Sequence, residues 1–146
     1  MSATVIGPVE DALLALLVAD GTLAAIEGPP QLGQPSDPPP RAVWIDPETD
    51  STQAADLSGG TERVETFELR VVCFAASSGS AYTSPRDAAA ALADRVSAII
   101  MANFHLSFQV GIVDIHQTGL KRDYGAWDKT QGYMYSVRIT CQAVLT

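Results

Sequence analysis

The sequence contains few of the residues that catalytic sites most often use. Among its 146 residues there are two histidines and two cysteines. Neither His105 nor His116 adjoins a serine or cysteine in a nucleophile motif, and no Gly-x-Ser-x-Gly occurs. We interpret His105 as a helix-end residue and His116 as a strand-edge residue, each satisfied by water or backbone. The sequence therefore predicts no catalytic residue and no enzymatic activity.

Basic residues are also scarce, and apolar runs are short. Nine Lys and Arg are scattered against 17 Asp and Glu, which gives a net charge of −8. Tight duplex-DNA binding needs clustered basic residues, so the charge excludes it. The longest apolar run, Ala12–Ala19, is too short to span a bilayer, and Met1–Gly7 lacks the basic start of a signal peptide. We expect one soluble intracellular domain over residues 1–146, with reduced thiols.

Metal and nucleotide sites lack the residue patterns that they need. Asp114 and His116 lie two positions apart on a predicted strand and so share a face, but no third ligand is visible. Gly59-Gly60 precedes Thr61 and a strand, whereas a phosphate cradle needs a helix N-terminus and usually a lysine. The sequence therefore predicts no metal and no cofactor.

Two amphipathic helices are expected. The first begins at Pro8 and carries an apolar stripe that ends near Gly21, a plausible stop signal. The second begins at Ser84-Pro85-Arg86-Asp87, which combines an N-cap serine, a first-turn proline and an acid three residues after the cap. The stripe of the first helix consists of Val9, Leu13, Leu16 and Leu17, and the inner face of the second of Leu92, Val96, Ile99, Ile100 and Asn103.

Between the two helices lies a proline-rich connector at about residues 27–60. Seven of the nine prolines fall in this segment. Within it, Arg41–Asp46 is predicted to form one short strand that ends before Pro47. The polar, glycine-containing stretch Glu48–Gly60 is predicted to be an exposed loop or arm.

Two long runs alternate apolar and polar residues with the period of a strand. They are Thr61–Ala75 and Tyr133–Leu145, and in both the odd positions form the more apolar face. Cys73 and Cys141 fall on these faces, so we interpret both as small core residues. Ser107–Gln117 is predicted to be a further strand with a bulge at Gly111.

These elements predict an α+β fold. We expect an antiparallel sheet, mixed at its edges, of about four to five strands with two main helices packed on one face.

Two groups of residues are candidates for protein contacts. Gly119–Gly132, a hairpin region or a protruding loop, has the charged and aromatic composition of an interface; alternatively, it is a solvated hairpin whose aromatics cover the sheet edge. The second face of the sheet is half-apolar and can meet a neighbouring subunit. The first group is Lys121, Arg122, Asp123, Tyr124, Trp127, Asp128 and Lys129. The second is Val72, Phe74, Met134 and Val144 beside Glu68, Arg70 and Arg138.

The order and spacing of these segments resemble the tail terminator (tail completion) proteins of long-tailed bacteriophages. The resemblance lies in an opening helix, VEDALLALLVADGTLAAI, a Gly/Pro-rich passage into the short strand PPRAVWID, and the long strand ERVETFELRVVCFA. The helix SPRDAAAALADRVSAII follows, and the chain closes with VGIVDIHQTGLKRDYGAWDKTQGYMYSVRITCQAVL. The long proline connector departs from the simplest pattern of that family.

The resemblance implies a structural role in a virion. Proteins of this family assemble in the host cytoplasm as a hexameric ring on the head-proximal end of the tail tube. The ring stops tube polymerisation and joins the tail to the head connector. The implied partners are other copies of the chain, the tail tube protein and the head–tail connector protein. Genomic DNA passes through the lumen without specific binding, and no membrane or cofactor is involved.

Two other interpretations stay open at this point. One is a different morphogenetic protein of similar size, such as a head-completion or head–tail joining (neck) protein, whose partner lies on the portal side. The other is a small α+β enzyme or ligand-binding domain. That alternative predicts a concave pocket that holds His116, Asp114 or the aromatic residues Tyr124 and Trp127.

Overall fold

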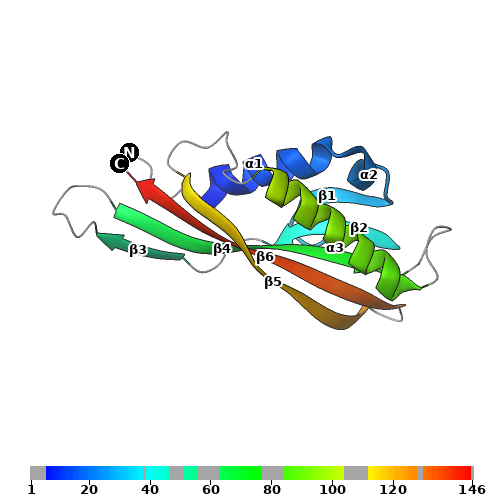
Figure 1. Ribbon diagram of the computed structural model, residues 1–146. Helices are drawn as coiled ribbons and strands as arrows, with labels where there is room; N and C mark the ends of the chain where they lie inside the picture. Colours follow the sequence, from blue (N-terminus) through cyan, green and yellow to red (C-terminus); the bar gives the residue numbers. More distant parts are fainter. Residues whose placement is uncertain are drawn as a thin grey trace.

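The computed structural model describes residues 6–37, 39–46, 51–55, 63–76, 84–103, 112–127 and 130–145. Within these residues, six strands form one mixed sheet and the helices cover one of its faces (Figure 1). The predicted α+β class, with a sheet mixed at its edge and two main helices on one face, is confirmed, although the strands number six. The elements are α1 (Ile6–Ala19), α2 (Gly21–Ala24), β1 (Gly28–Leu32), β2 (Arg41–Asp46), β3 (Ser51–Ala55), β4 (Arg63–Ala75), α3 (Pro85–Ala102), β5 (Ile112–Trp127) and β6 (Thr130–Leu145).

The two long alternating strands form the centre of the sheet. The strand order is β1-β2-β4-β6-β5, and β3 pairs with β4 off this path. β4 and β6 run antiparallel over the whole of β4, from Arg63 opposite Leu145 to Ala75 opposite Tyr133. β1 and β2 are parallel, whereas the other pairs are antiparallel. The sheet is therefore mixed only at one edge.

The second predicted helix begins where its capping residues indicate, whereas α1 begins at Ile6, two residues before the predicted start, because proline is tolerated anywhere in the first turn. Ser84 caps α3, because its hydroxyl accepts a hydrogen bond from the Asp87 backbone N–H at 3.2 Å and proline occupies the first turn. The stop predicted at Gly21 is only partly correct. α1 ends at Ala19, but Asp20 then caps the short helix α2 by accepting a hydrogen bond from the Leu23 backbone N–H at 3.1 Å.

The core lies between the helices and the odd-numbered face of the two central strands. Cys73 and Cys141 are fully buried in it, as predicted, and neither forms a disulfide. The apolar stripes of α1 and α3 pack onto this face. Its members, besides the two cysteines, are Val9, Leu13, Leu17, Leu23, Ile26, Val43, Ile45, Phe67, Leu69, Val71, Leu92, Ala93, Val96, Ile99, Ile100, Val137 and Ile139.

The connector contains more regular structure than its sequence predicts. The strand predicted at Arg41–Asp46 is confirmed as β2. β1, which includes Pro29 and Pro30, was not predicted; it is an edge strand, where a missing backbone donor is tolerated. The loop predicted for Glu48–Gly60 is wrong at Ser51–Ala55, which forms β3. Because β2 pairs only with the second half of β4, β3 takes the edge that remains along the first half.

The segment before the last strand is a hairpin rather than a protruding loop. β5 runs to Trp127 and β6 begins at Thr130, so most of Gly119–Gly132 lies in paired strands. The strand expected at Ser107–Gln117 is described only from Ile112, and the predicted bulge at Gly111 lies outside the described residues. Within the described part of β5, register irregularities occur between Ile112 and Asp114 and between Gln117 and Gly119.

Candidate interaction surface

We name the side of the sheet opposite the helices the helix-free face. It carries the even-numbered side chains of the central strands, because successive residues of a strand point to opposite faces. The residues of β2, β4 and β6 that define it are Trp44, Asp46, Glu68, Arg70, Val72, Phe74, Met134, Ser136, Arg138 and Thr140.

An apolar cluster occupies one half of the helix-free face. Trp44 and Phe74 are each 1 % exposed, and their ring centroids lie 6.3 Å apart with a tilt of 42°. Ala42 and Val72 complete the buried cluster, and Met134 packs against it. These side chains are as buried as those of the main core, although they lie on the face without helices. These residues thus form a second, small apolar core on the helix-free face.

A charged row crosses the sheet beside this cluster. Asp46, Arg70 and Arg138 are successive Cα partners on β2, β4 and β6. Arg70 Nη1 lies 3.6 Å from Asp46 Oδ2, and Arg138 Nε lies 4.0 Å from Glu68 Oε1. Asp46 is held in place by Trp44, whose indole Nε1 donates a hydrogen bond to Asp46 Oδ1 at 3.0 Å. The hydrogen bond between Trp44 and Asp46 therefore connects the apolar cluster to the charged row.

Each of the two arginines faces an acid at long distance. A guanidinium carries five N–H groups, but neither Arg70 nor Arg138 donates a hydrogen bond within the part of the chain that the structure describes. Arg138 Nε is buried and has no hydrogen-bond partner there. Beside them lies a hollow lined by Gln34, Trp44, Asp46, Arg70, Val72, Met134 and Ser136. The row thus contains two acids and two arginines, and the hollow beside it is lined by both polar and apolar residues.

The structure brings together only part of the predicted contact residues. Glu68, Arg70 and Arg138 meet on the helix-free face with Val72, Phe74 and Met134, as expected. The β5 residues are placed by their backbone alone, and their side chains, like that of Val144, lie outside the described residues, as do Asp128 and Lys129 entirely. By register, Lys121 is opposite Ser136, Arg122 opposite Tyr135, Asp123 opposite Met134, Tyr124 opposite Tyr133 and Trp127 opposite Thr130.

Sequence reasoning missed Trp44 and Asp46. The signal was present in the strand Arg41–Asp46, where four consecutive apolar residues lie between two charged ones. A short continuous apolar run is typical of a strand that is covered on both faces. In the structure both even-numbered residues of this run, Ala42 and Trp44, are buried on the helix-free face.

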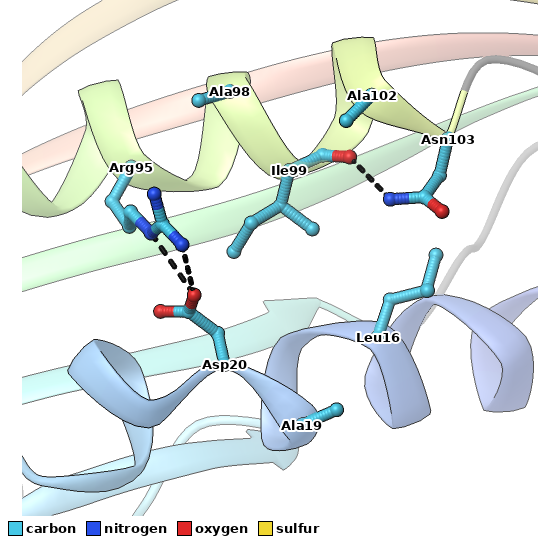
Figure 2. A pocket seen from close by; sticks show the side chains of 8 residues that line it. All are labelled: Leu16, Ala19, Asp20, Arg95, Ala98, Ile99, Ala102 and Asn103. Carbon is cyan, nitrogen blue, oxygen red and sulfur yellow. Dashed lines mark hydrogen bonds and ion pairs between the residues drawn. The ribbon is translucent and has the colours of Figure 1, made fainter.

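A second polar site joins the helices to each other (Figure 2). Arg95 of α3 points at Asp20, which it contacts through Nε, 3.0 Å from Oδ1, and through Nη2. The hydrogen bond from Arg95 is the main reason that the pKa of the Asp20 carboxyl lies below its ordinary value. Because Asp20 also caps α2, its two oxygens are both in use. The surrounding hollow of about 310 Å³ is mainly apolar, and its polar groups hold the fold together.

The structure adds no support for a catalytic or metal site. No group of three or more His, Cys, Asp or Glu that could hold a metal ion occurs among the described residues. Asp114 and His116 lie on the edge strand β5, opposite Gln142 and Thr140, while His105 and Gly59-Gly60 lie outside the described part. Of the helices that the structure describes, none has the length and hydropathy needed to cross a membrane.

Comparison with known proteins gives a match in structure but not in sequence. No protein-family model and no curated protein matches the chain. A chain from the solved structure described as "Virion of native gene transfer agent (GTA) particle" is similar in fold. Its TM-score is 0.70 at 19 % sequence identity, over 99 % of this chain and 100 % of that one. The protein therefore has a fold that also occurs in a virion component.

Proposed function

We propose that this protein is a structural, non-enzymatic virion protein that forms a ring on the head-proximal end of a phage tail tube. The ring, expected to be hexameric, stops tube polymerisation and joins the tail to the head connector. Its partners are further copies of the chain, the tail tube protein and the connector protein. It is assembled in the host cytoplasm.

The observation that carries the proposal is the likeness in fold to a chain of a phage-like virion particle. The likeness extends over 99 % of this chain and 100 % of the other. Fold alone does not determine function. The order of segments in this sequence, which resembles tail terminator proteins, therefore supplies the more specific part of the proposal.

The surface chemistry supports an assembly role. Beside its buried apolar cluster, the helix-free face carries a partly exposed row of two acids and two arginines, and arginine is a residue type enriched at protein interfaces. A net charge of −8 suits a ring through which DNA slides, because an acidic lumen does not hold phosphates.

A head-completion or head–tail joining (neck) protein is the alternative that the same observations support. The likeness to a virion component does not distinguish a position on the tail side from one on the portal side. Both roles need an oligomeric ring, but they differ in the product that accumulates when the protein is missing.

The test is electron microscopy of particles from an infection that lacks this gene, with the gene supplied in trans as the control. Overlong, headless tails beside filled heads are the expected result for a terminator. Tails of normal length that fail to join heads would instead indicate the neck role. Normal virions would refute both and favour the remaining alternative, a small α+β enzyme or ligand-binding domain.

A further inference from the structure

The sheet is divided along its strands into two parts, which we name the first strip and the second strip. The first strip contains β1, β2 and the parts of β4, β6 and β5 that pair beside them, and the second strip contains β3 and the parts of β4, β6 and β5 that pair beside it. Figure 1 shows β3 at the opposite end of β4 from β1 and β2. Each strip therefore ends in β5 on one flank and in its own edge strand on the other. One row of paired residues in the first strip is Gln31, Trp44, Val72, Ser136 and Lys121, and one in the second strip is Ser51, Phe67, Cys141 and Ile115.

Both flanks of the first strip carry features that prevent a further strand from pairing. β1 contains Pro29 and Pro30, which have no backbone N–H to offer. On β5, the residues of this strip include three consecutive charged ones, Lys121, Arg122 and Asp123. Prolines and charged residues on edge strands protect proteins against edge-to-edge association. The first strip therefore ends the sheet on both sides.

The second strip has no comparable protection. β3, whose sequence is STQAA, contains neither a proline nor a charged residue. On β5, the segment Asp114–Gln117 lies between the two register irregularities and contains no proline and one charged residue. Among the described residues, β3 pairs only with β4, and β5 only with β6. In that part of the chain, the second strip is thus open to a further strand on both flanks.

The direction of the backbone groups on β3 follows from a hydrogen bond at the end of β4. The Ala76 N–H donates to the Pro40 carbonyl oxygen at 2.7 Å, on the side of β4 where β2 lies. In antiparallel strands the residues alternate, so that one bonds to the strand on one side and the next to the strand on the other. The even-numbered residues of β4 therefore bond to β2 and β3, and the odd-numbered residues bond to β6. Thr52, which is opposite Thr66, thus bonds to β4, whereas the N–H and C=O of Gln53 point to the open flank.

The same alternation places an open donor on β5. Gln142 is opposite Thr66, an even-numbered residue of β4, so its backbone groups point away from β4 and bond to β5. Asp114, opposite Gln142, therefore bonds to β6, and the N–H and C=O of Ile115 point to the open flank. Gln53 and Ile115 thus carry backbone donors and acceptors that have no partner strand in the described part of the chain.

We infer that β5 of one subunit pairs with β3 of the next subunit. Every copy of the chain carries both open edges on opposite flanks of the same strip, so a second copy supplies the edge that the first one lacks. Within one chain, β3 and β5 run in opposite directions, because the three pairs that separate them are all antiparallel. A rotation that places the second strips of two copies side by side keeps those directions, so the contact is a regular antiparallel pair.

This contact joins two different edges, and such contacts generate a closed ring when the rotation closes. Pairing of two β5 edges with each other would instead stop at a dimer and leave β3 open on both copies. The inference therefore rests on the proposed ring and names the strands that hold it together.

Removal of one backbone donor tests the inference. Gln53→Pro removes the N–H that points to the open flank and leaves the hydrogen bonds between β3 and β4 in place. Gln53→Ala is the matched control, because it changes the side chain and keeps the N–H. Each variant replaces the native gene in an infection, and particles in which a tail is joined to a head are counted by electron microscopy. We expect normal numbers of joined particles with Gln53→Ala and a loss of them with Gln53→Pro.

The fold of the proline variant is checked in the purified chain. Circular dichroism and urea denaturation should give Gln53→Pro the spectrum and the unfolding midpoint of Gln53→Ala. Normal numbers of joined particles with Gln53→Pro would overturn the inference. If Gln53→Pro does not fold, the decision passes to cross-linking, which leaves the backbone unchanged.

Cross-linking between engineered cysteines tests which edges meet. Thr52 of β3 and Asp114 of β5 lie in one row of the second strip, and both are replaced by cysteine. Purified particles are treated with a short bismaleimide, whose length tolerates a difference in register. The native Cys73 and Cys141 are fully buried and do not interfere. The controls are each single variant and a chain with Gln31→Cys and Asp114→Cys, in which the cysteine on β3 is exchanged for one on the protected edge strand β1.

We expect a ladder of linked multimers from Thr52→Cys with Asp114→Cys and only monomers from every control. Dimers from either single variant would show that like edges meet and would overturn the inference, as would multimers from the Gln31→Cys control. Particles that contain the chain but no linked species would also overturn it and would leave the proposed function in place. Absence of the chain from purified particles would refute the proposed function itself, and the inference with it.

Discussion

Gly132 lies under the Phe74 ring, so a methyl group added there should destabilise the protein. A Cβ at Gly132 would collide with the ring, reach within 2.7 Å of its Cζ and lie 3.0 Å from the Ala75 carbonyl oxygen. Without such contacts, replacing a strand glycine by alanine usually stabilises a protein by about 0.5–1 kcal/mol. Overpacking costs about 1–3 kcal/mol, and here it opposes a smaller gain. We therefore expect Gly132→Ala to lower the free energy of unfolding by about 1–2 kcal/mol.

The assay is urea denaturation followed by circular dichroism. The two proteins can be compared if their m-values, the slopes of unfolding free energy against urea concentration, are equal. Gly7→Ala is the matched control, because nothing lies within 4 Å of a Cβ at that position and the helix should gain stability. A double variant that combines Gly132→Ala with Phe74→Leu tests whether the Phe74 ring causes the loss of stability. If the ring is responsible, alanine should cost less in the Phe74→Leu background than in the native one. A Gly132→Ala protein that is as stable as the native protein would refute the reasoning.

Three further predictions follow from the same structure. Trp44→Ala should cost about 3–5 kcal/mol in urea denaturation, since a fully buried ring is removed; a cost below about 1 kcal/mol would show that the ring is dispensable. Arg95 holds the pKa of the Asp20 carboxyl below its ordinary value. The stability that Asp20 contributes is therefore fully present above the ordinary aspartate pKa of about 4 and is lost as the pH falls through the lowered pKa. The advantage of the native protein over Asp20→Asn should shrink as the pH is lowered below about 4, and a constant difference would contradict this. Burial raises the pKa of the Cys73 thiol, so neither Cys73 nor Cys141 should react with Ellman's reagent until urea unfolds the chain.

The sequence predicted well the elements whose signal is local. Ser84 and Pro85 define the start of α3, and the alternation in β4 identifies Cys73 as a core residue, because capping and strand period depend only on neighbouring residues. It predicted poorly the strands whose formation depends on pairing with a strand that is distant in the sequence. Ser51–Ala55 becomes β3 since the first half of β4 offers it an open edge, and nothing within those five residues contains that information.

On the candidate surface, too, the sequence predicted the local features but not those that depend on pairing between strands. Arg70 and Arg138 could be assigned to the second face from their even positions in two alternating runs. Their direct opposition could not be predicted, because it depends on the register between β4 and β6. The burial of Trp44 beside them depends in addition on what covers the helix-free face, which a period within one strand does not show.

The position of β6 between β4 and β5 has a consequence for how the protein is made. β4 cannot obtain its long partner until roughly 60 further residues have been synthesised, which takes several seconds at about 5–20 residues per second. During that interval β4 can pair only with β2 and β3, which precede it in the chain. The nascent protein thus exposes one edge of its central strand to solvent until the closing hairpin leaves the ribosome. Slow translation of the intervening segment would lengthen that exposure, and a chaperone that shields the edge would protect the chain until β6 pairs with it.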